Sequence, residues 1–132
     1  MLHDIENSTD VQFLVDTFYK KVVADPEIGF IFTEVMKTDF VHHLPVMVSF
    51  WEFILLGKEG FRGNLMDAHL RTHQMVPLTE AHFDRWLTIW HETLDANFVG
   101  EKTEEAKWRA KSIADMTRFK LAGQQPYFQQ KI

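Results

Sequence analysis

Apolar side chains recur along most of the chain at the three- and four-residue spacing that places them on one face of an α-helix. The alternation of apolar and polar residues that is typical of β-strands is not sustained in any segment. The pattern therefore predicts an all-α protein with four substantial helices. Because the sequence has neither an internal repeat nor a linker rich in Pro or Ser, a single domain over residues 1–132 is expected.

The first helix is predicted to begin near Ser8 or Thr9, whose hydroxyls can cap its free N–H groups. It should end at Asp25, because the residue before a proline avoids the helical conformation. A short turn that carries Phe32 is expected to follow. The predicted buried stripe of this helix consists of Val11, Leu14, Val15, Phe18 and Val22.

The second helix is predicted to follow a cap at Thr38 or Asp39 and to end at Gly57. Its residues 44–56 are apolar on nearly every face, which indicates a deeply buried helix. The next segment, 57–64, contains three glycines and is expected to be a loop.

A short helical piece is expected around 65–73, after which Thr79 caps a third long helix that ends at Gly100. The apolar stripe of this third helix includes Trp86 and predicts that the Trp86 ring is buried in the core. The last long helix is predicted to begin at Thr103.

Composition and charge exclude several classes of protein. The chain has no cysteine, which excludes disulfides, thiolate metal sites and covalent attachment of c-type haem. Its net charge of −5 argues against nucleic-acid binding, which needs a basic surface. No stretch is long and apolar enough to cross a membrane, and the first residues lack a signal-peptide pattern. We therefore expect a cytoplasmic protein that binds neither nucleic acid nor membranes.

A flat apolar ligand would explain the aromatic and histidine content of the chain. Twelve Phe and four Trp are more than a plain helical core of this length needs, and seven His accompany them. The motifs of zinc proteases, di-iron carboxylate proteins, phosphate-binding loops and serine hydrolases are absent from the sequence. An iron porphyrin would use both residue types, because it needs a neutral imidazole as axial ligand and a wide apolar slot. A histidine of the predicted short helix, His69 or His73, could provide that imidazole.

Four stretches carry a family resemblance through their order and spacing. They are residues 18–32, 50–52, 63–69 and 82–87, which read FYKKVVADPEIGFIF, FWE, GNLMDAH and HFDRWL. Together they resemble the truncated haemoglobins, most closely the third group, over nearly the whole chain. The glycine pairs typical of the first group are missing. The resemblance implies a globin-like two-over-two helical sandwich that binds haem b.

The resemblance also implies roles for individual residues. On the distal side of the haem, Tyr19 matches the distal tyrosine, His43 the distal histidine, and Trp86 the indole donor shared by the second and third groups. Phe32 matches the aromatic residue that packs on the haem, and Met47 faces the ligand pocket.

For the proximal iron ligand the resemblance offers two histidines. His69 matches through the preceding Gly63-Asn64 context, whereas His73 fits better the distance to Trp86 found in other truncated globins. Loops absorb insertions more easily than the start of a helix does, which favours His69 and keeps His73 as the alternative.

The function implied by the resemblance is the binding of dioxygen or another diatomic ligand at ferrous iron. Three distal donors would stabilise the partial negative charge on bound dioxygen and slow its release. Redox chemistry or detoxification of oxygen, nitric oxide or peroxide, served by a reductase, is therefore expected rather than bulk oxygen transport. The sequence does not decide whether this makes the protein an enzyme with dioxygenase- or peroxidase-like activity. The alternative interpretation is a haem-free helical module whose aromatic groove binds an apolar ligand or a partner helix.

Overall fold

A computed structural model of the chain describes residues 1–61, 69, 71–73 and 75–122. Its long helices are α1 (Ser8–Ala24), α2 (Phe40–Leu56), α4 (Glu80–Asn97) and α5 (Glu101–Leu121), and a short π-helix, η1 (Ile31–Val35), follows α1. Residues 69, 71–73 and 75 are also helical. No strand lies among the described residues, which confirms the all-α prediction. Within the same residues no helix is long and apolar enough to cross a membrane.

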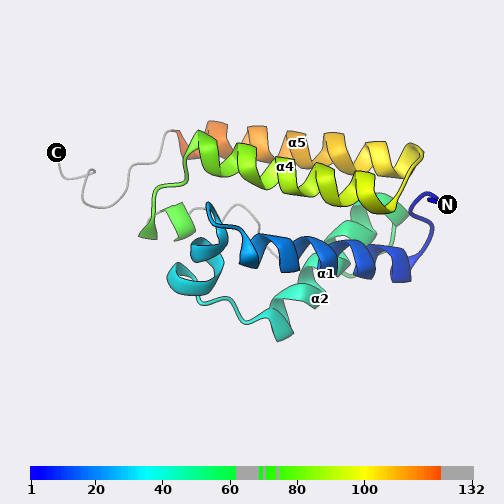
Figure 1. Cartoon of the computed structure of the whole chain (residues 1–132), viewed down its shortest axis with the longest axis horizontal. Helices are drawn as coiled ribbons and strands as arrows, with labels where there is room; N and C mark the ends of the chain where they lie inside the picture. The colour runs from blue at the N-terminus through cyan, green and yellow to red at the C-terminus, as the bar shows by residue number, and fades with distance from the viewer. Residues whose placement is uncertain (62–68, 70, 74, 123–132) are drawn as a thin grey trace.

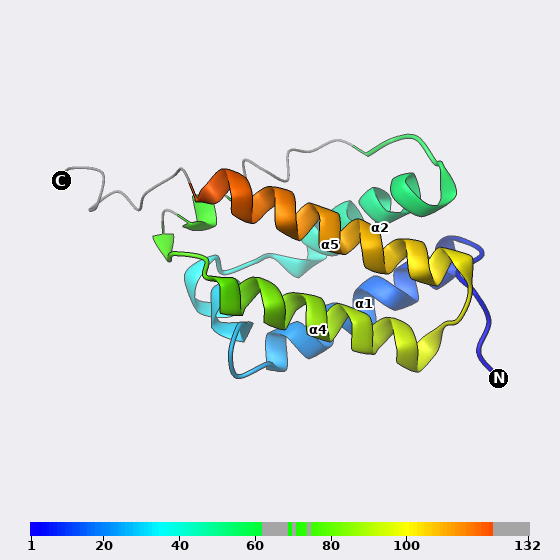
Figure 2. The same ribbon diagram turned by 90° about the horizontal axis from the view of Figure 1, so that it is seen from above.

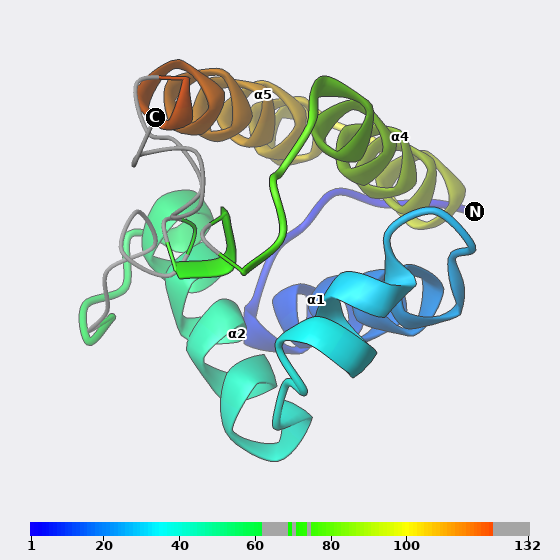
Figure 3. The same cartoon turned by 90° about the vertical axis from the view of Figure 1, so that its left-hand side faces the viewer.

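The four long helices form two layers of two (Figures 1 and 3). α1 and α2 make one layer and α4 and α5 make the other, with α1 packed against both α2 and α4. α4 and α5 run in opposite directions along the molecule (Figure 2). The helical residues 69, 71–73 and 75 lie near the end of the molecule where α4 begins and α5 ends. This is the two-over-two arrangement expected from the sequence.

The caps of α2 and α4 are those predicted from the sequence. The Asp39 carboxylate accepts a hydrogen bond from the Val41 backbone N–H, and Gly57, in the left-handed region with φ 67°, ends α2. The Thr79 hydroxyl accepts from the His82 backbone N–H, while the His82 ring accepts from the Thr79 backbone N–H. Both helices therefore begin where nearby side chains satisfy their first N–H groups.

The cap of α1 differs from the prediction by one residue. Asn7 is the cap, because its side chain accepts a hydrogen bond from the Asp10 backbone N–H, and Ser8 and Thr9 are already helical. The helix ends before Asp25, as predicted. Its buried residues are the predicted stripe of Val11, Leu14, Val15, Phe18 and Val22.

The start of α5 also differs from the prediction. The helix begins at Glu101, two residues before Thr103. Its first N–H groups are satisfied from the N-terminal segment, where the Asp4 carboxylate accepts from the backbone N–H groups of Lys102 at 2.8 Å and Thr103 at 2.9 Å. The Thr103 hydroxyl donates to the same carboxylate at 2.8 Å. The cap is therefore contributed by a residue far away in the sequence.

The core fills the space between the two layers. α2 is less deeply buried than predicted, because it packs with one face against α1 and α5 and leaves its opposite face to solvent. Phe53 on that face is 50% exposed. The residues that α2 buries are Met47, Phe50, Trp51 and Leu55.

A charged contact fixes the end of α1 against α4. The Asp25 side chain, only 2% exposed, accepts hydrogen bonds from the Glu27 and Ile28 backbone N–H groups and from Arg85, whose Nη2 atom lies 2.7 Å away. Burial alone would raise the pKa of Asp25, but these hydrogen bonds and the guanidinium charge hold that pKa below its usual value. The contact holds the α4 turn that carries Trp86 against the end of α1.

Candidate functional site

A cavity of about 570 Å³ lies between the two helical layers, a volume typical of small-molecule and cofactor sites. Residues of α1, η1, α2, α4 and α5 line it, together with the helical residues His69, Arg71 and Thr72. Its walls are mostly apolar and rich in rings. The aromatic residues that line it, histidines apart, are Phe18, Tyr19, Phe32, Phe50, Trp51, Phe83, Trp86 and Trp90.

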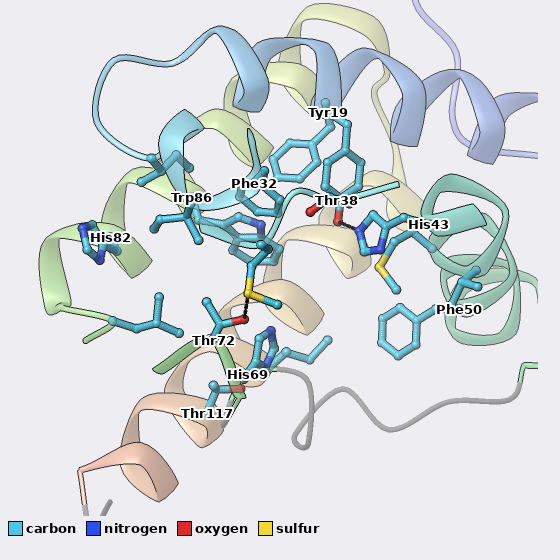
Figure 4. A pocket seen from close by; sticks show the side chains of 18 of the residues that line it. Tyr19, Phe32, Thr38, His43, Phe50, His69, Thr72, His82, Trp86 and Thr117 are labelled. Atoms are coloured by element: carbon cyan, nitrogen blue, oxygen red, sulfur yellow. Dashed lines mark hydrogen bonds between the residues drawn. The ribbon is translucent and has the colours of Figure 1, made fainter. Parts of the chain in front are cut away.

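Two polar side chains meet on one side of this cavity (Figure 4). The Tyr19 hydroxyl oxygen lies 3.1 Å from the His43 Nε2 atom, within hydrogen-bond distance. Burial raises the pKa of the Tyr19 phenol and lowers the pKa of the His43 imidazole. Both groups are therefore neutral near pH 7, and we call them the Tyr19–His43 pair.

Packing holds the Tyr19 ring in place. It follows the buried Phe18 on α1, whose ring lies 5.1 Å away, and it meets the Phe32 ring at 5.9 Å and the Phe40 ring at 5.9 Å. These edge-on and tilted contacts fix the direction of the hydroxyl. Phe32 also lines the cavity, as does the buried Met47. The resemblance thus named Tyr19, Phe32, His43 and Met47, and the structure places all four at one cavity.

His69 lines the cavity from the side opposite the Tyr19–His43 pair (Figure 4). Burial lowers the pKa of its imidazole, which favours the neutral form that binds metals. Its Nδ1 atom is buried and has no hydrogen-bond partner among the described residues. His69 thus presents a neutral ring, without a structural hydrogen bond at Nδ1, to an apolar space.

His73 has a different environment. It is 8% exposed and is not among the described residues that line the cavity. Its Nδ1 atom accepts a hydrogen bond from the Leu78 backbone N–H at 3.0 Å. In a neutral ring that accepts at Nδ1, the proton sits on Nε2, so that atom has no lone pair for a metal. The structure therefore gives His73 a role in holding the loop before α4.

Trp86 lines the cavity and packs against the core, but it is only partly buried, so its ring is less deeply buried than the apolar stripe predicted. Its ring lies parallel to that of Trp90, 6.2 Å between centroids, and Trp90 in turn stacks on Trp51 at 4.6 Å. The fully buried Trp90 donates its indole N–H to the Ala106 carbonyl at 3.0 Å. The Trp86 indole has no hydrogen-bond partner in the described part of the chain. The apolar stripe predicted which face of α4 packs inward, but no pattern in the sequence predicted the cavity beside that face.

The sequence did not predict that the segment between η1 and α2 belongs to the site. Met36, Lys37 and Thr38 all line the cavity. The Thr72 hydroxyl, on the segment that carries His69, donates to the Met36 sulfur at 3.3 Å. Periodicity gives no signal for such a connection, because its residues belong to no helix face.

The side chains available as metal ligands fit a metal that is bound within a cofactor, not one that the protein alone holds. Among the described residues no group of three or more His, Asp or Glu side chains could hold a metal ion by itself. One neutral imidazole with an unpartnered buried nitrogen, facing an apolar cavity with ring-lined walls, matches the needs of an iron porphyrin. The Gly63-Asn64 context that pointed to His69 lies outside the described residues.

Comparison with known proteins also indicates a globin. The family model described as "Bacterial-like globin" matches residues 3–121. A group 3 truncated hemoglobin of Campylobacter jejuni is 28% identical over 111 residues, which covers 82% of this chain and 85% of the relative. A crystal structure of a group III truncated hemoglobin from Campylobacter jejuni superposes with a TM-score of 0.80 at 27% identity, covering 92% of this chain and 95% of that chain. These matches confirm the resemblance stated from the sequence.

Proposed function

The chain belongs to the bacterial-like globin family and is a haem-binding globin, and we propose that its cofactor is haem b and that it binds dioxygen or a similar diatomic molecule. The proposed use is redox chemistry or detoxification of oxygen, nitric oxide or peroxide. The observation that carries the proposal is the placement of His69, partly buried and favoured in its neutral form, opposite the Tyr19–His43 pair in one apolar cavity.

His69 would hold the haem by coordinating the haem iron. Bound haem would supply an iron that can coordinate one protein ligand and one small molecule. Burial keeps the imidazole neutral, and neutral imidazole is the form that coordinates a metal. His73 is the weaker candidate, because its Nδ1 already accepts from the Leu78 N–H.

The opposite side of the cavity would bind and orient the diatomic molecule. When the neutral His43 carries its proton on Nε2, it donates to the Tyr19 oxygen, and the phenol proton is free to point at the ligand. The Trp86 indole N–H, which has no partner among the described residues, is the second donor available there. Hydrogen bonds to a ligand with partial negative charge hold it and slow its release.

Slow release does not suit bulk oxygen transport and suits chemistry on the bound ligand. The same donors that hold dioxygen also polarise an O–O bond, which supports a redox role. Such turnover needs electrons, so the proposal includes a reductase partner and a cytoplasmic location where reductants are plentiful. The haem-free interpretation is not favoured, because the chain belongs to a globin family.

The first experiment asks whether the chain takes up haem. The purified protein, titrated with hemin, is expected to bind one equivalent and to show an intense Soret band. A His69→Gly variant, which lacks the imidazole, tests whether this side chain is needed for the Soret band. A colourless protein that takes up no hemin would overturn the proposal.

The second experiment asks what chemistry the loaded protein performs. The reduced protein is mixed with dioxygen and then with nitric oxide, and nitrate is measured as the product. A Tyr19→Phe variant reports whether the distal hydroxyl matters. Bulk transport would be indicated instead if dioxygen left rapidly and no nitrate formed.

A further inference from the structure

The described residues that both line the cavity and are exposed show where it opens to solvent. They are Lys37, Asp39, His42, Val46 and Arg71. Within the described lining, Lys37 and Arg71 are the two side chains with a permanent positive charge near neutral pH. The opening is thus polar and partly cationic, whereas the interior is apolar.

The backbone at Lys37 is unusual. With φ 49°, Lys37 is the one non-glycine residue with a positive φ among the described residues. This left-handed conformation is unfavourable for a residue with a Cβ atom, and lysine has no short polar side chain that relieves it. It occurs where η1 ends and the chain turns into α2. Such strain often marks residues that are kept for function.

The Lys37 charge has no ion-pair partner in the described part of the chain. The nearby Asp39 carboxylate is already engaged, since one oxygen lies 2.5 Å from the His42 Nδ1 atom and the other accepts from the Val41 backbone N–H. The ammonium of Lys37 is therefore available to a negatively charged ligand at the opening.

We propose that Lys37 binds one of the carboxylate groups that the porphyrin carries, at the opening of the cavity. This inference rests on the proposed function, because it concerns how the haem is held. Haem combines flat apolar rings with charged carboxylates, so its rings would fit the apolar interior and its carboxylates the polar opening. A lysine ammonium on a flexible stem suits that position as a compact point charge.

The test measures how fast hemin leaves the protein. Hemin transfer to an excess of apomyoglobin is followed for the parent, Lys37→Asn and Lys37→Arg. An exposed ion pair of ordinary strength predicts about two- to fivefold faster hemin loss for Lys37→Asn, and near-parent loss for Lys37→Arg. Asparagine tolerates a positive φ, so the Lys37→Asn apoprotein should be at least as stable in urea as the parent. Lys21→Asn removes an exposed charge of α1 away from the cavity and should leave hemin loss unchanged.

A change on the ligand side separates a carboxylate contact from a structural effect. Hemin dimethyl ester lacks both carboxylate charges, so the parent and Lys37→Asn should release it at the same rate. If Lys37→Asn released hemin at the parent rate, or released hemin and its ester faster by the same factor, Lys37 would be a turn residue only. A parent that takes up no hemin would overturn the proposed function as well, so the two failures are distinguishable.

Discussion

The Tyr19 hydroxyl oxygen and the His43 Nε2 atom, from α1 and α2, lie 3.1 Å apart at the wall of the cavity. This one contact joins two helices that are separated in sequence by the whole of η1 and its flanking turns. It also couples the proton positions of two neutral groups, because only one of them can donate to the other. The histidine tautomer therefore decides whether the tyrosine proton is available to a ligand.

Tyr19→Phe should speed the release of dioxygen from the reduced, haem-loaded protein. The variant keeps the ring and its contacts with Phe18 and Phe32, and it loses only the hydroxyl. A hydrogen bond to a partly charged group contributes roughly 1.5–3 kcal/mol, which corresponds to about a 10- to 150-fold faster off-rate. Stopped-flow displacement of dioxygen by CO measures this rate. An off-rate equal to that of the parent would remove Tyr19 from the ligand site.

His69→Gly and His73→Gly should have opposite effects. His69→Gly should abolish the normal Soret spectrum, and added imidazole should restore it by filling the vacated space. His73→Gly should keep the spectrum but lower the free energy of unfolding by about 1–3 kcal/mol, because the Leu78 N–H loses its acceptor. Hemin titration and urea unfolding measure the two effects. The reverse pattern would assign the iron ligand to His73.

Trp86→Phe and Trp90→Phe form a matched pair on one helix. Trp90→Phe removes the donor to the Ala106 carbonyl and should cost about 1–3 kcal/mol of stability, with the Fe–CO stretching frequency unchanged. Trp86→Phe should cost less stability, because its indole has no partner to lose among the described residues, and should shift the Fe–CO frequency. Resonance Raman spectroscopy of the CO complex measures the shift. An unshifted band in Trp86→Phe would make Trp86 a wall residue without a ligand contact.

Asp4→Ala should destabilise the fold through the start of α5. Loss of a side chain that caps a helix costs about 0.5–2 kcal/mol. Burial alone would raise the pKa of Asp4, but hydrogen bonds from Lys102, Thr103 and Ile5 hold that pKa below its usual value. The stabilisation is therefore fully present above the unfolded-state pKa of about 3.9 and is lost as the pH falls through the lower folded-state pKa.

The pH series supplies the control for this last prediction. The difference in stability between the parent and Asp4→Ala, measured by urea unfolding, should be constant from pH 7 to about pH 5 and should shrink below about pH 4. A difference that persisted undiminished into acid would mean that Asp4 acts through packing and not through its charge.

The fold could be predicted largely from local patterns. The α1 stripe, the Asp39 and Thr79 caps and the Gly57 stop are all local signals, and the structure confirms each of them. The start of α5 was predicted wrongly, because Asp4 caps this helix. Asp4 and the start of α5 lie too far apart in the sequence for a local pattern to include both. Long-range contacts of this kind cannot be found from periodicity.

The candidate site was predicted mainly from the family resemblance. Composition indicated an aromatic pocket with a histidine, but it could not choose between His69 and His73, which share one helix face. The structure distinguishes them, because His69 lines the cavity whereas the Nδ1 atom of His73 accepts a hydrogen bond from the Leu78 N–H. Lys37 had no sequence signal at all, because a backbone dihedral angle is decided by the tertiary fold.

The parallel rings of Trp86 and Trp90, continued by Trp51, give the molecule an internal optical reporter. Three of the four tryptophans border the cavity, and Trp108 is exposed on α5. A porphyrin in that cavity would accept their excitation energy, so its arrival would quench most of the ultraviolet emission and its departure would restore it. The stacked indoles should also couple their near-ultraviolet transitions and give a strong circular dichroism signal. The filling of the cavity can therefore be followed in the unlabelled protein.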